Sequence, residues 1–158
     1  MVPRVFQGPG VLMRAPVIVL AVVLILPLLG MSPPAAPDFV VIVHRDNPLK
    51  SIPFAELQRI YRKQTRMWGH GESVVPVDWD STSELREEFS RRVMNRTVRE
   101  MADFWVQQNI TQGLTPPTTL KSARAILRFV ASVPGAIAYV PVADVDDTIK
   151  KVEIKGLR

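Results

Sequence analysis

Residues 75–89 read VPVDWDSTSELREEF, and this stretch decides the fold. A short apolar run ends at Asp78, three hydroxyl residues follow at positions 81–83, and an amphipathic pattern starts at Glu84. This pattern is typical of a buried strand that leads into the N-terminus of a helix. Helix N-termini bind anions through free backbone N–H groups, but they are also capped by their own serines. The stretch therefore indicates either an anion site or an ordinary helix start.

In the rest of the chain, segments whose hydrophobic residues are typical of strands alternate with segments whose hydrophobic residues repeat with the helical period of about 3.6 residues. We expect strands over residues 39–43, 74–77, 136–142 and 149–154 (the last a final strand or a sheet edge), helices over 51–60, from 84 onward, over 98–108 and over 122–133, and a loop over 109–120. Strands that alternate with helices predict a small α/β sheet with crossover connections and helices on its faces. Ligands of such sheets bind beyond the carboxyl ends of the strands, where the stretch above begins its helix.

The first 32 residues have the pattern of a signal peptide. Residues 15–29 form an uncharged apolar run, preceded by Arg4 and Arg14 and by no acidic residue. The run has the length of a signal-peptide core and is shorter than the roughly 20 residues that span a bilayer. We expect residues 1–32 to be a signal peptide, or an N-terminal anchor if they are not cleaved. Met13 is an alternative start.

Residues 33–37 form a Pro/Ala-rich spacer, and residues 38–158 form one domain. The chain contains no cysteine, which excludes disulfides and thiol catalysis. Its net charge is +5, but without Arg4 and Arg14 the 20 basic residues fall to 18 against 15 acidic ones. This excess is too small and too dispersed to indicate nucleic-acid binding.

Two stretches, residues 41–78 and 134–154, resemble the PstS-like, phosphate-type substrate-binding proteins of ABC transporters, which have the type II periplasmic binding protein fold. The matching pieces are HRDNP at 44–48, VPVD at 75–78 and PGAIAYV at 134–140. The resemblance extends over residues 39–154 and is greatest to a short variety of little more than one lobe. It implies a single-lobe, three-layer α/β domain with a small mixed sheet flanked by helices.

The resemblance also implies a function. The chain would be an exported protein of the periplasm or another extracytoplasmic space that captures a small oxyanion such as phosphate, without catalysis or a cofactor, and passes it to an inner-membrane ABC permease. The ligand-binding residues would be Ser81, Thr82 and Ser83, assisted by Arg86 and Lys63.

The sequence departs from the family at the ligand turn. Asp78 stands where the family has an arginine, and STSE at 81–84 replaces its Ser-Gly-Thr turn. A carboxylate in place of a cation repels a phosphate dianion by roughly 1 to 4 kcal/mol at about 4 Å, depending on screening. We therefore expect the affinity for phosphate to be reduced.

Four alternatives remain open. Ser81 and Glu84 have the spacing of a capping box, which would use the helix start for capping. Lys63 is also explained by a solvated basic helix end. The domain could be a one-lobe accessory or protein-interaction module that has lost anion binding, or it could form a homodimer that completes a cleft.

Metal binding and catalysis have little support in the sequence. His44 and His70 are the two histidines, and neither has a second histidine or a cysteine at metal-ligand spacing. The aspartates at 144, 146 and 147 lack the pattern of a calcium loop. The chain also has no G-x-S-x-G nucleophile motif. We therefore expect no enzyme, no metal site and no cofactor.

Overall fold

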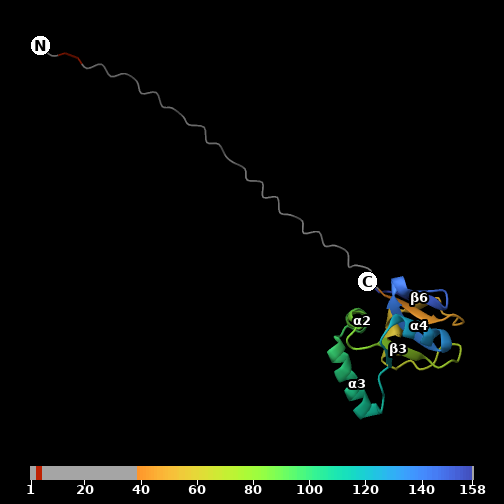
Figure 1. Cartoon of the computed structure of the whole chain (residues 1–158). Coiled ribbons are helices and arrows are strands. Elements are labelled where there is room, and N and C mark those ends of the chain that lie inside the picture. The colour runs from red at the N-terminus through yellow and green to blue at the C-terminus, as the bar shows by residue number, and fades with distance from the viewer. Residues whose placement is uncertain (1–2, 5–38, 158) are drawn as a thin grey trace. The chain divides into compact units, whose positions relative to one another are not determined.

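The structure is a computed structural model of the chain and describes residues 3, 4 and 39–157 (Figure 1). Residues 39–157 belong to one compact unit. The predicted signal peptide at 1–32, except for positions 3 and 4, and the predicted spacer at 33–37 lie outside the described residues. Among the helices of the described part, none has the length and apolar character needed to cross a membrane.

The described domain is built on one six-stranded sheet in the order β2-β6-β1-β5-β3-β4. The strands are β1 (Phe39–His44), β2 (Ser51–Pro53), β3 (Val75–Trp79), β4 (Thr118–Leu120), β5 (Ala136–Pro141) and β6 (Ile149–Lys155). β1 is antiparallel to both of its neighbours, β5 and β6. β3 is parallel to β4 and β5, and β2 is parallel to β6. The sheet is therefore mixed, as the resemblance to phosphate-type binding proteins implies.

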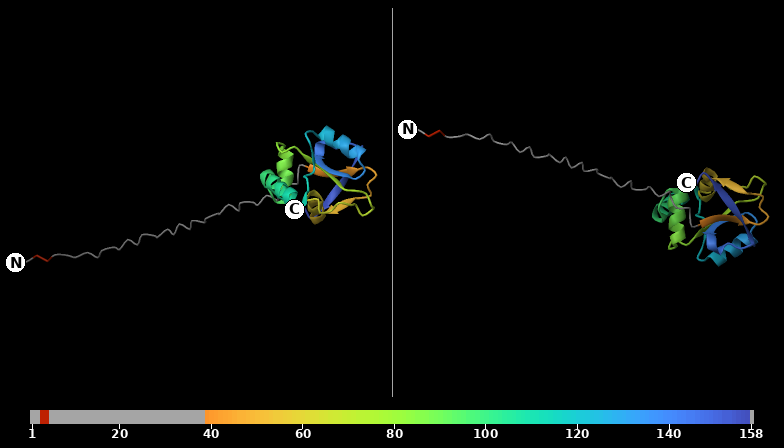
Figure 2. Two further views of the ribbon diagram at one scale, coloured as in Figure 1. Left: turned by 90° about the horizontal axis from the view of Figure 1, so that it is seen from below. Right: turned by 90° about the horizontal axis from the view of Figure 1, so that it is seen from above.

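Helices cover both faces of the sheet. They are α1 (Phe54–Tyr61), α2 (Glu84–Met94), α3 (Val98–Gln112) and α4 (Ala123–Ser132), with a 3-10 turn, η1 (Val142–Asp144). Val41 and Val43 of β1 pack in a core with α1, α2 and α3, whereas Ile42 packs in a second core with α4. This alternation is the period of two expected for a strand covered on both faces. In the left view of Figure 2, α1 and α4 accordingly lie on opposite sides of the strands.

Two short strands correct the prediction. The helix expected from Ser51 begins at Phe54, because residues 51–53 pair with residues 153–155 of β6. Pro53 is the extended N-cap residue of α1, with φ −60° and ψ 140°. Residues 118–120, expected in a loop, pair with β3. The last strand, β6, lies between β2 and β1 and is therefore not a sheet edge.

Helix α3 is longer than predicted. It begins after Thr97, which forms a capping box with Glu100. It continues through residues 109–112, which the sequence analysis placed in a loop, and ends at Gly113, whose φ is 65°. Glycine adopts this left-handed conformation at little cost, so it terminates the helix. Figure 1 shows α3 beside α2, away from the centre of the sheet.

Candidate anion-binding site

The turn between β3 and α2 is held by Asp80. Its carboxylate accepts hydrogen bonds from the backbone N–H of Thr82 at 3.1 Å and from the Thr82 hydroxyl at 2.7 Å. These hydrogen bonds hold the pKa of the exposed Asp80 carboxyl below its usual value. The backbone N–H of Ser83 donates to the carbonyl of Asp80 at 3.0 Å. Of the three predicted hydroxyl ligands, Thr82 thus already donates its hydroxyl hydrogen bond within the turn.

The first turn of α2 has no side-chain cap. Its N-cap residue is Ser83, whose side chain makes no capping hydrogen bond. The capping box predicted for Ser81 and Glu84 is therefore wrong for this helix. By contrast, the hydroxyl of Ser122 caps α4 by accepting from the N–H of Ala125 at 3.3 Å. The first N–H groups of a helix lack partners within the helix, so those of α2 are available to a ligand or to water.

Arg86 is the predicted cation of the site, and the structure pairs it with Asp78. Only 8% of Arg86 and 2% of Asp78 are exposed, and the two side chains form an ion pair. The hydroxyl of Tyr139 donates to the Asp78 carboxylate at 2.5 Å, and the backbone N–H of Trp79 donates to it at 2.9 Å. Asp78, which the sequence analysis expected to repel an anion directly, instead neutralises the arginine.

Two buried tyrosines, Tyr61 and Tyr139, lie near this ion pair. The ring of Tyr139 stacks on Phe89 with 3.8 Å between ring centroids. The hydroxyl of Tyr61 donates to the carbonyl of Val77 at 3.0 Å. Burial raises the pKa of both Tyr61 and Tyr139 well above the usual range, and the charge of Arg86 opposes this shift only in part. Both tyrosines therefore remain neutral hydrogen-bond donors.

A groove of about 470 Å³ opens between this corner and α3. Ser81 and Arg86 line it on the side of the corner. Most of the remaining lining is apolar and comes from α3: Val98, Ala102, Trp105, Val106 and Ile110. The groove combines a few polar groups with a mostly apolar wall, which is the usual composition of a ligand site.

Lys63 does not line this groove. It lies just after α1 with φ 55°, and its ammonium group donates to the carbonyl of Pro116 at 3.1 Å. Desolvation, and secondly the charge of Arg66, lower the pKa of Lys63. Together with Thr65 and Arg66 it lines a separate hollow. Trp68 from the same segment is buried, and its indole N–H donates to the carbonyl of Gly135.

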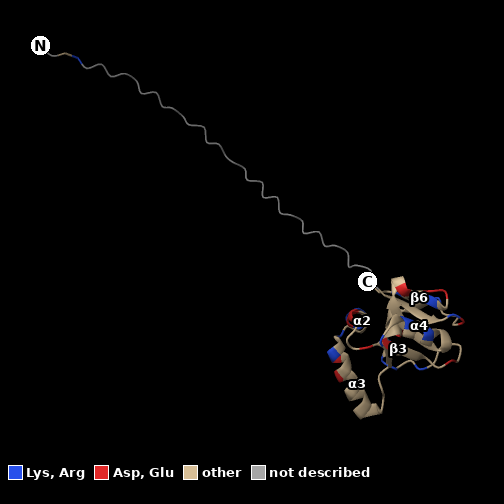
Figure 3. Cartoon of the chain, in the orientation of Figure 1, with Lys and Arg blue, Asp and Glu red and all other residues tan. Residues whose placement is uncertain are grey.

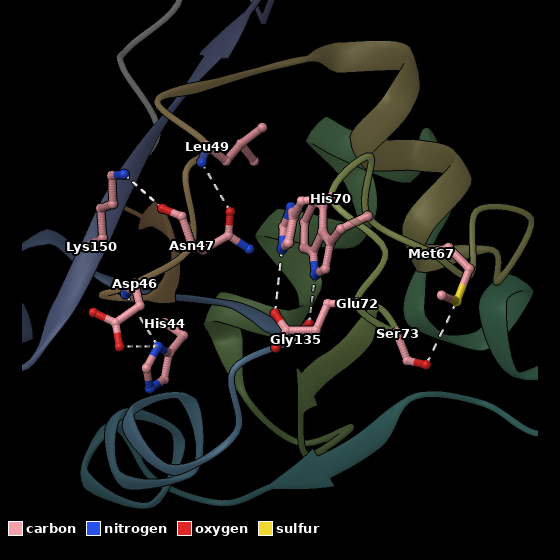
Figure 4. Close-up of polar contacts among 11 residues, drawn as sticks. His44, Asp46, Asn47, Leu49, Met67, His70, Glu72, Ser73, Gly135 and Lys150 are labelled. Carbon is pink, nitrogen blue, oxygen red and sulfur yellow. Dashed lines mark hydrogen bonds and ion pairs between the residues drawn. The ribbon is translucent and has the colours of Figure 1, made fainter.

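The two histidines lie at separate places (Figure 4). His44 contacts Asp46 through Nδ1, whereas Nε2 of His70 lies 3.3 Å from a carboxylate oxygen of Glu72. Within residues 3, 4 and 39–157, no group of three or more His, Cys, Asp or Glu side chains is placed to hold a metal ion. Neither histidine lines the groove beside Ser81.

The sequence analysis missed two contributors to the site. Tyr139 was assigned to a strand without a role, and its contact with Asp78 joins residues that are 61 positions apart. The α3 wall was also missed, although Ala102, Val106 and Ile110 recur every four residues. That spacing marks one face of a helix and was a usable signal.

Comparison with known proteins finds similarity in structure but not in sequence. No family model matches the chain, and no curated protein matches it. An ABC-type phosphate transport receptor from Vibrio cholerae matches with a TM-score of 0.61 and 16% identity, over 75% of this chain and 47% of that chain. A putative phosphate ABC transporter substrate-binding protein with bound phosphate from Clostridium perfringens matches with a TM-score of 0.61 and 21% identity, over 77% and 46%.

PstS from Borrelia burgdorferi matches with a TM-score of 0.58 and 11% identity, over 77% of this chain and 48% of that chain. The chain thus spans slightly less than half the length of each of these proteins. Identities this low support conclusions about the fold alone. The predicted resemblance is confirmed at that level: the described domain has the mixed α/β fold of part of the PstS-like phosphate ABC transporter substrate-binding proteins.

Proposed function

We propose that the chain is an exported, non-catalytic binding protein that captures a small, phosphate-like oxyanion at the N-terminus of α2. The observation that carries the proposal is the uncapped first turn of this helix, which follows the carboxyl end of β3. Ser81, just ahead of that turn, lines the open groove. An uncapped helix start next to a free hydroxyl and an open groove supplies hydrogen-bond donors that an anion accepts.

The anion would be held mainly by hydrogen bonds, and the site would carry little net charge. The donors are the first backbone N–H groups of α2 and the hydroxyls of Ser81 and Ser83, aided by a helix-dipole contribution of about 0.3 to 1 kcal/mol. Arg86 adds donors at the groove, but Asp78 cancels its charge. Glu84 in the first turn opposes a bound anion. We therefore expect weak binding and a preference for a monoanion over a dianion.

The proposed biological setting is delivery of the anion to an inner-membrane ABC permease outside the cytoplasm. The export part rests on the signal-peptide pattern of residues 1–32. The transport part is supported by two structural neighbours, an ABC-type phosphate transport receptor and a putative phosphate ABC transporter substrate-binding protein. Because the chain covers less than half of those proteins, their ligand and their partner are proposals for this chain.

Calorimetric titration of the full-length chain with phosphate and with sulfate tests the proposal. The probe variants are Ser81→Ala and Ser83→Ala, and the matched control is Ser122→Ala, which removes the capping serine of α4. We expect weak saturable binding by the unmodified chain and several-fold weaker binding by the two probe variants. The control should bind normally while losing about 1 kcal/mol of stability.

Absence of heat with both anions up to high millimolar concentrations would overturn the proposal and leave the accessory-module alternative. Equal loss of binding in Ser83→Ala and Ser122→Ala would also contradict it, because the effect would then not be specific to α2. Arg86→Ala is unsuitable as a probe, since it leaves Asp78 buried without its partner.

Asp78→Asn tests the electrostatic part of the proposal. This substitution keeps the shape of the side chain and removes the charge that neutralises Arg86. If the folded variant, checked by circular dichroism, binds sulfate more tightly than the unmodified chain, the arginine contributes to the site. Unchanged affinity in a folded variant would assign binding to α2 and the serines alone.

A further inference from the structure

Helix α3 carries an exposed apolar ridge formed by Ala102, Val106 and Ile110. Val106 is 61% exposed and Ile110 is 79% exposed, and they are two of the four large hydrophobic side chains that are exposed in the described part of the chain. Residues four apart on a helix are neighbours on its surface, so the three side chains form one continuous line. α3 directs other residues, Met101 and Trp105, into the core.

The ridge has a hollow on each side. Val106 and Ile110 line the groove of about 470 Å³ that Ser81 and Arg86 also line. The same two residues line a second hollow of about 360 Å³, together with Asp103, Gln107 and Thr111. Helices pack by inserting the ridge of one into the groove of another. An interface related by a two-fold axis uses the same surface of both copies, so a ridge flanked by a hollow on each side is a candidate for pairing with a second copy of itself.

The charge distribution narrows the choice of partner. Residues 104–112 of α3 contain no Asp, Glu, Lys or Arg. Figure 3 shows this as the uncharged end of α3, with the charged residues confined to its start. The arginine that lines the groove, Arg86, is already paired with Asp78. Asp103 is the charged residue that lines the second hollow. Along residues 104–112 a charged partner would gain no ion pair, whereas an apolar helix would bury the ridge.

We propose that two copies of the chain associate through their α3 ridges, antiparallel and related by a two-fold axis at Val106. With a rise of about 1.5 Å per residue, Ala102 and Ile110 lie about 6 Å to either side of Val106 along the helix. Ala102 of one copy therefore meets the partner's Ile110, so that a small side chain faces a large one. The partner helix also covers the groove beside Ser81. This pairing does not depend on anion binding.

Cysteine cross-linking tests the pairing, because the natural chain contains no cysteine. Packed helix axes lie about 8 to 10 Å apart and each Cα lies about 2.3 Å from its axis, which leaves about 3.5 to 5.5 Å between facing Cα atoms. The upper part of this range suits a disulfide. In the full-length chain, Val106→Cys should form a disulfide-linked dimer under mild oxidation. The dimer is detected on non-reducing gels.

The matched control is Val142→Cys, because Val142 is 54% exposed and lies outside α3. At micromolar protein, Val106→Cys should cross-link about a hundredfold faster, since paired thiols have a millimolar effective concentration. A mixture of Ala102→Cys and Ile110→Cys chains should also cross-link rapidly. Ala102→Cys alone should not, because the two-fold axis holds its thiols about 12 Å apart along the helices.

Equal cross-linking rates for Val106→Cys and Val142→Cys would overturn the proposal. Either both thiols would then react through random collisions between chains, or neither would react. Rapid cross-linking of Ala102→Cys alone would overturn the antiparallel arrangement. Absence of phosphate binding by the unmodified chain, with rapid cross-linking of Val106→Cys retained, would overturn only the proposed function, so the two proposals fail independently.

Discussion

The β3–α2 corner and helix α3 are neighbours, but the corner buries charged side chains whereas α3 exposes apolar ones. The corner buries a charged pair, Asp78 and Arg86, and satisfies it with a tyrosine hydroxyl and a backbone N–H. Helix α3 instead leaves Val106 and Ile110 exposed. A buried charge is tolerated only when it is paired, whereas exposed apolar side chains cost the fold little and are free to contact another surface. The charged pair of the corner is therefore satisfied within the domain, and α3 is the part suited to association.

The two helix starts differ in the opposite sense. Thr97 and Glu100 cap α3 reciprocally, whereas Ser83 leaves the first turn of α2 uncapped. The helix with a complete N-terminus thus carries the contact surface, and the helix with an open N-terminus faces the groove. The differences between the two regions lead to four predictions.

Arg86→Ala should have the largest effect on stability. It leaves the Asp78 carboxylate buried without its cation, which costs about 3 to 5 kcal/mol. Urea unfolding at neutral pH measures this loss. The control is Arg91→Ala, which removes an exposed ion pair with Glu87 and should cost about 0 to 1 kcal/mol. Similar losses for the two variants would show that the corner pair is not buried in solution.

Alkaline pH should unfold the domain through the corner. Tyr61 and Tyr139 are the two tyrosines of the chain, and burial raises the pKa of both. Their contribution is fully present below the unfolded-state pKa of about 10 and falls by about 1.4 kcal/mol per tyrosine for each pH unit above it.

In a spectrophotometric titration, tyrosinate absorbance should appear together with the loss of the circular dichroism signal. Tyr139→Phe should halve the absorbance change, because Tyr61 is the one tyrosine left. Gradual ionisation in a chain that keeps its native circular dichroism would contradict the buried positions of these hydroxyls.

Thr97→Ala should have an intermediate effect, restricted to α3. It removes the hydroxyl that accepts from the N–H of Glu100 at 3.2 Å, a change that costs about 1 kcal/mol. Thermal or urea unfolding gives the value. Ser83→Ala serves as the comparison and should leave stability nearly unchanged, because Ser83 makes no capping bond. A larger loss for Ser83→Ala than for Thr97→Ala would reverse the contrast between the two helices.

Ile110→Thr should have the smallest effect on the single chain. Because Ile110 is largely exposed, its replacement should change the free energy of unfolding by less than about 0.5 kcal/mol at low protein concentration. At high concentration the unmodified chain should become more stable and the variant should not, since association stabilises the native state by mass action. A large loss at low concentration would mean that Ile110 packs within its own domain.

The sequence predicted the long elements well and the short ones poorly. The helix expected over 122–133 is observed at Ala123–Ser132, because its apolar residues repeat with the helical period. The three-residue strands at 51–53 and 118–120 were missed. Segments this short show no periodicity of their own, and pairing with β6 and β3 forms them.

The same limit applies to the site. Ser81 and Arg86 were predicted together and do line one groove, whereas Lys63 lines another hollow. The role of Asp78 was misjudged, because its distance to Arg86 depends on how the turn after β3 folds back. The contribution of Tyr139 depends on the sheet, which places β5 beside β3.

By itself, the sequence determined the alternation of strands and helices, the α/β class, the resemblance to phosphate-binding proteins and the position of the turn at 81–83. These follow from local periodicity and motifs, and the mixed sheet follows from the resemblance. Only the tertiary structure decided that Arg86 is neutralised, that the first turn of α2 is uncapped and that α3 presents an apolar ridge. The physical reason is that charge pairing, capping and exposure depend on distances between side chains, which the packing of the sheet and its helices sets.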